Sequence, residues 1–129
     1  MTQKAQSLAG LERIARLKAD IEMRRFAAFR AHVEAARERI GGLEQELQSL
    51  YHTDESFSIA EARLVNTLAG ERSRALLIAE RELERMLPGY EQARRDAARE
   101  FGRAEAVHAL REDVVAQLRL DRARRAGGA

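Results

Sequence analysis

The chain has 129 residues, of which 34% are charged and 5% aromatic, and it contains no tryptophan and no cysteine. This composition, rich in Ala, Glu, Arg and Leu, is typical of long helices and coiled coils, and the lack of cysteine excludes disulfides and thiolate metal sites. The formal net charge of +2 predicts no strong attraction to nucleic acid, and no apolar run reaches the ~20 residues of a membrane span. Because the N-terminus also lacks the apolar core of a signal peptide, we expect a cytoplasmic protein.

A first long helix is predicted over about residues 4–50. Its later part carries a strict heptad of apolar residues, which indicates a coiled-coil seam. The seam residues are Phe26, Phe29, Val33, Ala36, Ile40, Leu43, Leu47 and Leu50. The heptad crosses Gly41 and Gly42, so we expect the helix to continue there as a soft spot or a close helix approach, at about 1 kcal/mol per glycine. Before Phe26, residues Leu11, Ile14 and Ile21 follow a heptad one residue out of phase, which predicts a slip near residues 22–25.

A turn is predicted at about residues 51–56, where Thr53, Asp54 and Ser56 favour turns and helix caps. Glu61 follows Ser58 by three residues, the spacing of a capping box. A second long helix is therefore expected over about residues 57–125.

The second helix contains Pro88 and Gly89, a pair that is a strong turn signal. The heptad nevertheless crosses this pair without a change of phase, and a reversal of the chain has no reason to preserve that phase. We therefore predict one continuous helix kinked at Pro88, with a three-helix bundle turning at 88–89 as the alternative. The predicted seam is Ala62, Val65, Ala69, Arg72, Leu76, Ala79, Leu83, Met86, Tyr90, Ala93 and Ala97, followed by a shift of one residue to Phe101, Ala104, His108, Val115 and Leu118.

The predicted fold class is all-α, a long antiparallel two-helix coiled-coil hairpin that forms a single domain over residues 1–129. With the turn near residue 54, the numbers of facing residues add up to about 109. Leu50 then faces Ile59, and Phe26 faces Leu83. The second helix extends about twenty residues beyond the start of the first.

No catalytic constellation is predicted. Glu105 and His108 have the Glu-x-x-His spacing of di-iron bundles, but neither His32 nor His52 has a glutamate three residues before it. Gly41 and Gly42 lack the Lys-Ser/Thr that follows a phosphate-binding loop. We expect no enzyme activity, no cofactor and no metal.

Three surfaces are candidates for partner binding. The basic C-terminal end fits either stabilisation of the helix C-terminus or contact with an acidic protein surface; its residues are Arg119, Arg122, Arg124 and Arg125. The apolar and basic N-terminal segment fits packing on the second helix, on a partner or on a membrane surface. A second apolar set flanks the seam and fits a broad seam, a partner-binding face or a homodimer; it comprises Leu64, Leu68, Leu77 and Ile78. Because a lone two-helix hairpin buries little core, we expect an external partner.

The stretches "SIAEARLVNTLAGERSRALLIAERELERML" and "YEQARRDAAREFGRAEAVHALRED" resemble the arginine-rich second half of the FliJ/YscO family, and "LAGLERIARLKAD" resembles its start. The tryptophans frequent in that family's second helix are absent here. The resemblance implies a central-stalk protein of flagellar and type III export, whose helix ends insert into the hexameric export ATPase and whose middle contacts the export-gate membrane protein. It assigns ring contact to Leu11, Arg13, Arg16, Arg119, Arg122, Arg124 and Arg125, and gate contact to Leu64, Leu68 and Ile78.

On this interpretation the partners are proteins, with no nucleic acid or small-molecule substrate. Membrane association is at most peripheral, at the inner face of the cytoplasmic membrane. The alternative is a homodimeric coiled-coil adaptor or scaffold without a role in export.

Overall fold

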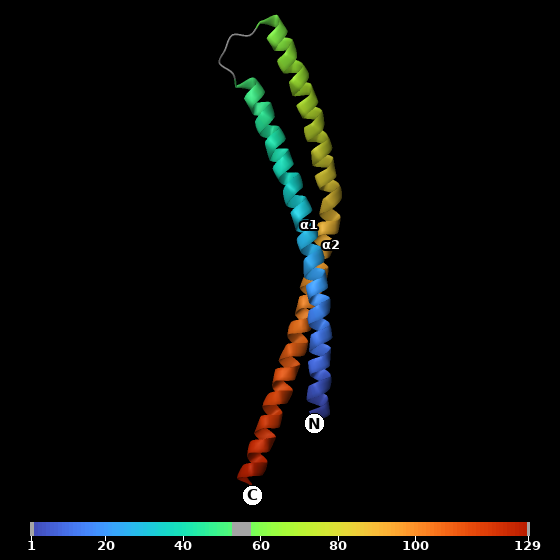
Figure 1. The fold of residues 1–129 in the computed structure, drawn as a ribbon, viewed down its shortest axis with the longest axis vertical. Helices are drawn as coiled ribbons and strands as arrows, with labels where there is room; N and C mark the ends of the chain where they lie inside the picture. Colours follow the sequence, from blue (N-terminus) through green and yellow to red (C-terminus); the bar gives the residue numbers. More distant parts are fainter. Residues whose placement is uncertain (1, 53–57, 129) are drawn as a thin grey trace. The chain divides into compact units, whose positions relative to one another are not determined.

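The protein, described by a computed structural model for residues 2–52 and 58–128, consists of two long helices (Figure 1). Helix α1 spans Thr2–Tyr51 with 50 residues, and α2 spans Ile59–Gly127 with 69 residues. Tyr51 still belongs to α1, whereas the turn residues predicted at 53, 54 and 56 lie outside the described part of the chain. This architecture confirms the predicted all-α two-helix hairpin.

The helices divide into two compact units, each containing one segment of α1 and one of α2. Unit 1 comprises Met1–Ala27 with Gln92–Ala129, and unit 2 comprises Ala28–Glu91. Within each unit the α1 segment runs antiparallel beside the α2 segment (Figure 1). The two units carry different surfaces.

The beginning of α2 is capped as the sequence predicts. The backbone N–H of Glu61 donates to the Ser58 hydroxyl oxygen at 3.2 Å, and the N–H of Ala62 donates to the Ser58 carbonyl at 3.0 Å. These bonds satisfy donors that have no partner within the first turn of a helix, so the serine marks where α2 starts.

In unit 2, α2 continues through Pro88 and Gly89 without interruption, so the alternative of a three-helix bundle is wrong. Gly89 is the site of a close approach between the helices. A Cβ atom added there would lie 2.8 Å from Cε1 of Phe29, closer than ordinary van der Waals contact allows. The close approach considered for Gly41 and Gly42 is wrong, because an added Cβ at either position meets nothing within 4 Å.

The seam of unit 2 follows the predicted heptad. Val33 is the one large side chain with less than 2% exposure in the described chain, and the small residues Ala69 and Ala79 are buried as well. The rest of the seam is only partly covered, because two helices leave most side chains open on one flank.

In unit 1 the α1 seam differs from the prediction. The heptad of Phe26 continues toward the N-terminus without a slip and places Leu8 together with small and acidic residues against α2: Glu12, Ala15, Ala19 and Glu22. Leu11, Ile14 and Ile21, the predicted seam, are between 53% and 62% exposed. The predicted slip at 22–25 is therefore wrong, since a regular helix keeps its phase whatever residues occupy the facing positions.

The α2 seam of unit 1 also keeps its phase, so the predicted shift after Ala97 is wrong. Phe101, expected in the seam, is 54% exposed, whereas Ala104 is buried as expected. His108 and Val115 are half-buried beside the seam. The in-phase positions are Ala97, Glu100, Ala104, Val107, Arg111, Val114 and Leu118, all buried or half-buried.

The alignment of the two helices also differs from the prediction. In unit 2, Glu46 contacts Arg72 and Phe29 lies against Gly89, and the numbers in each pair add up to 118 rather than about 109. Leu50 therefore lies across from Leu68 instead of Ile59, and the seam position of Phe26 does not face Leu83. The physical reason is that the first turns of α2 extend beyond the end of α1, which leaves Ile59 78% exposed (Figure 1).

Candidate functional site

A buried carboxylate interrupts the small apolar seam of unit 1. Glu12 in α1 is 5% exposed and accepts hydrogen bonds from both helices. From α2, Arg111 Nη1 donates to Oε2 at 2.7 Å and His108 Nδ1 donates to Oε1 at 2.6 Å. From α1, Arg16 donates to Oε1 at 3.2 Å through Nε and 3.1 Å through Nη2. We call these four residues the Glu12 cluster.

The Glu12 cluster holds its carboxylate in the charged form. The hydrogen bonds from Arg111 and then His108 lower the pKa of Glu12 from 4.5 to about 2, although burial acts in the opposite direction. His108 donates from Nδ1 because an ionised carboxylate can only accept. The cluster resembles a polar layer in a coiled coil, which favours one alignment of the helices over others.

Glu22 is the second acidic residue in this seam, and its hydrogen bonding differs from that of Glu12. Its Oε2 atom is buried and has no hydrogen-bond partner among the described residues. A buried polar atom without a partner costs free energy, so Glu22 destabilises the seam that Glu12 stabilises.

One flank of α1 in unit 1 presents apolar and basic residues to solvent. They follow a second heptad, in which each residue immediately precedes a seam position in the sequence. We call them the basic stripe: Lys4, Leu11, Ile14, Lys18 and Ile21. Because Glu12 pairs with Arg111, the exposed Leu110 of α2 lies level with Leu11 on the same flank. The largest aliphatic side chains of this segment thus face away from the helix pair rather than into it.

The predicted ring-contact residues lie at two levels of unit 1. Leu11, Arg13 and Arg16 are exposed near the Glu12 cluster, with Arg16 also bonded to Glu12. The start of α1 lies ten residues before Glu12 and therefore level with Asp121, so α2 overhangs by about six residues rather than about twenty. The exposed Arg122, Arg124 and Arg125 occupy this overhang, and Arg119 lies just before it.

Unit 2 carries an exposed stripe of the opposite charge on α2. Its residues each stand one position before a seam residue, and we call it the acidic stripe: Glu61, Leu64, Leu68, Glu71, Ile78 and Glu82, with Ala75 between them and Arg85 at the next position after them. It contains the three predicted gate-contact residues, of which Leu64 is 59% exposed, Ile78 is 54% exposed and Leu68 is half-buried. Leu77, also 47% exposed, lies beside Ile78 and outside the stripe.

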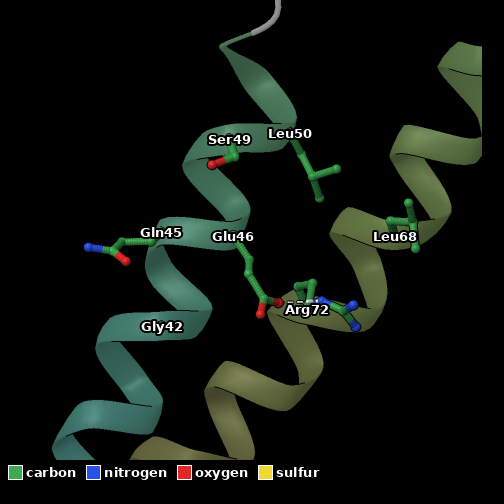
Figure 2. A pocket seen from close by; sticks show the side chains of 7 residues that line it. All are labelled: Gly42, Gln45, Glu46, Ser49, Leu50, Leu68 and Arg72. Atoms are coloured by element: carbon green, nitrogen blue, oxygen red, sulfur yellow. Dashed lines mark ion pairs between the residues drawn. The ribbon is translucent and has the colours of Figure 1, made fainter.

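An open hollow of about 510 Å³ adjoins the acidic stripe in unit 2 (Figure 2). Leu50 of α1 and Leu68 of α2 point toward one another across it, and Gly42 leaves space because it has no side chain (Figure 2). The ion pair between Arg72 Nε and Glu46 Oε2, at 2.6 Å, bounds the hollow. Its lining combines aliphatic side chains with an acidic group, which suits an aliphatic side chain flanked by a cation.

The two units differ in charge. Unit 1 carries 15 Lys and Arg against 9 Asp and Glu, whereas unit 2 carries 8 against 12. The small net charge of the whole chain therefore conceals a basic unit and an acidic unit, a division that the linear sequence does not mark.

Comparison with known proteins does not assign the chain to a family. The sequence matches no protein-family model, and neither a curated protein nor a solved structure is similar to it. Across residues 2–52 and 58–128, no three metal-binding side chains gather at one place. Neither described helix contains a segment apolar and long enough to cross a membrane.

The Glu12 cluster and the exposure of the basic stripe escaped the sequence-based prediction, whereas Leu64, Leu68 and Ile78 of the acidic stripe were predicted to flank the seam. Extending the heptad of Phe26 toward the N-terminus places Glu12 in the seam, and extending that of Ala97 toward the C-terminus places Arg111 there. Oppositely charged residues in two seams predict an ion pair between them. The predicted seam ran through the large apolar residues rather than along the unbroken heptad, so it did not include this ion pair.

Proposed function

We propose that this protein is a non-enzymatic coiled-coil stalk of the flagellar or type III protein export apparatus, which inserts into the export ATPase ring and links it to the export gate. The proposal rests on the resemblance of its sequence to the FliJ/YscO family. The observation that carries it is the outward basic stripe of unit 1, in which Leu11, Ile14 and Ile21 face solvent while Ala15 and Ala19 face α2. A helix that turns its largest aliphatic residues outward has a face suited to a protein partner.

The basic end of α2 supports the same proposal. Arg124 and Arg125 lie in its last turn, where they also stabilise the negative end of the helix dipole. Together with Arg122 they project beyond the start of α1, so the end that enters a ring is a single basic helix. Contact with acidic groups of the ring would use this charge.

Binding to the cognate hexameric export ATPase tests the proposal. Wild type is expected to bind the ring and stimulate ATP hydrolysis, and a variant carrying Leu11→Ser and Ile14→Ser is expected to lose both. The matched control is Phe101→Ser, which changes an equally exposed apolar residue of unit 1 one residue after the seam rather than before it. Absence of ring binding by wild type, or equal loss in the control, refutes the stalk.

The gate-contact part is tested separately. Leu64→Ser combined with Ile78→Ser is expected to abolish binding to the soluble part of the export-gate protein and to leave ring binding intact. Loss of both activities would mean that the two surfaces are not independent.

The charge difference between the units favours a second candidate, the homodimeric scaffold. A basic and an acidic apolar stripe on one chain allow two copies to pair. If the homodimer is the functional state, adding the export ATPase does not dissociate the dimer. If the stalk proposal holds, the ATPase competes with the second copy and dissociates the dimer.

A further inference from the structure

The two stripes have matching form. Each lies one residue ahead of its seam and repeats at heptad spacing, so each is half of a coiled-coil interface without a partner. In the basic stripe, Lys18 stands between Ile14 and Ile21. In the acidic stripe, Glu71 stands between Leu68 and Ile78. The apolar positions suit one another, and the charged positions are opposite in sign.

The hollow in unit 2 adds a complementary shape to this match. Gly42 and Ser49 of α1 leave space beside Leu68, so an aliphatic side chain docking on the acidic stripe gains a place to enter (Figure 2). Glu46 at its edge is paired with Arg72, so the negative charge beside the hollow comes from the acidic stripe itself. The basic stripe supplies the corresponding leucine and isoleucine side chains next to lysines.

Pairing of like stripes is disfavoured. Two basic stripes bring Lys4 and Lys18 against their own copies, and two acidic stripes do the same for Glu61, Glu71 and Glu82. Like charges across an interface oppose association. Only the pairing of unlike stripes combines apolar burial with charge neutralisation.

We infer that a second copy of this chain is the occupant of both stripes: the basic stripe in unit 1 of one copy docks on the acidic stripe and hollow in unit 2 of another. Every copy offers both surfaces, so the contact joins identical chains. The contact covers Leu11 and Ile14 on one copy and Leu64 and Ile78 on the other, which the stalk proposal assigns to the ring and the gate. Self-association is therefore the partner-free state of those surfaces, and it supplies the interface of the homodimer that is the second candidate function.

Sedimentation equilibrium over about 1 to 200 µM protein measures the association. Wild type is expected to form dimers that weaken as salt is raised, because exposed ion pairs are screened. Lys18→Glu and Glu71→Lys are each expected to weaken self-association about tenfold or more, since each places like charges at the contact between the stripes. Mixing the two variants is expected to restore dimers, because the changed basic stripe of one variant and the changed acidic stripe of the other again carry opposite charges.

The hollow is tested without a change of charge. Gly42→Met fills it, and the space around Gly42 accepts a side chain without a clash inside the hairpin. This variant is expected to lose dimers while retaining its helix content by circular dichroism. The control is Gly102→Met, which adds the same side chain at an equally open glycine of unit 1 that lies outside both stripes.

The inference is overturned if wild type stays monomeric throughout, if the mixture of charge variants does not recover dimers, or if Gly42→Met and Gly102→Met dimerise equally. Ring binding is measured at protein concentrations below the dissociation constant of the dimer, where the protein is monomeric. Its result therefore does not depend on these outcomes. The stalk and the self-association can therefore be refuted separately.

Discussion

The contact between Gly89 and Phe29 predicts that two chemically identical substitutions have opposite effects on stability. Replacing a glycine in a helix interior by alanine stabilises the helix by about 0.5–1 kcal/mol. Gly41→Ala is expected to show this gain, because the added methyl group meets nothing within 4 Å. Gly89→Ala is expected to lose it, because the methyl group lies 2.8 Å from Cε1 of Phe29 and displaces the ring.

The magnitude follows from the cost of overpacking. Forcing a side chain from its place in a packed interface costs about 1–3 kcal/mol. After the gain in helix stability, Gly89→Ala is expected to lower the free energy of unfolding by about 0.5–2 kcal/mol. For a chain of this size, about 1 kcal/mol corresponds to roughly 3–6 °C in Tm.

Thermal and urea unfolding, followed by far-ultraviolet circular dichroism, measures both variants. The unfolded-state contribution of a Gly→Ala change is common to both, so their difference reports the native contact. In a Phe29→Leu background, Gly89→Ala should become stabilising, with a coupling of at least about 1 kcal/mol in the double-mutant cycle. If Gly89→Ala is as stable as Gly41→Ala in the wild-type background, the close approach at Pro88–Gly89 does not exist.

Three further predictions concern the seam. Because the pKa of Glu12 is lowered to about 2, its contribution to stability is full above about pH 4.5 and is lost as the pH falls toward 2. Glu12→Gln should remove this part of the pH dependence of stability, measured by urea unfolding. A pH profile equal to that of wild type would contradict the hydrogen bonds of the Glu12 cluster. Val33→Ala should lower the free energy of unfolding by about 2 kcal/mol and Ile14→Ala by less than about 1 kcal/mol. The reverse order would mean that Ile14 lies in the seam, as the predicted slip at residues 22–25 requires. Since the chain contains no native cysteine, oxidation of a variant with Leu50→Cys and Leu68→Cys should form a disulfide readily, whereas Leu50→Cys with Ile59→Cys should not.

The sequence by itself determined that the chain forms two helices and where each one starts or continues. Heptad spacing acts within one helix, and the Ser58 cap acts within one turn, so neither depends on the partner helix. The unbroken phase across Pro88 favoured a continuous helix over a chain reversal, and α2 does run through Pro88.

Only the tertiary structure decided the alignment of the helices and which residues face outward. A heptad repeats along its length and therefore fits a partner at several axial positions, so the pattern alone does not choose between pair sums of 109 and 118. Contacts between specific residues make that choice in unit 2, namely Gly89 against Phe29 and Glu46 against Arg72. Hydrophobicity suggested that Leu11 and Ile14 are buried, but the rigid phase of α1 directs Glu12 and Ala15 to the seam and leaves the leucine and isoleucine exposed.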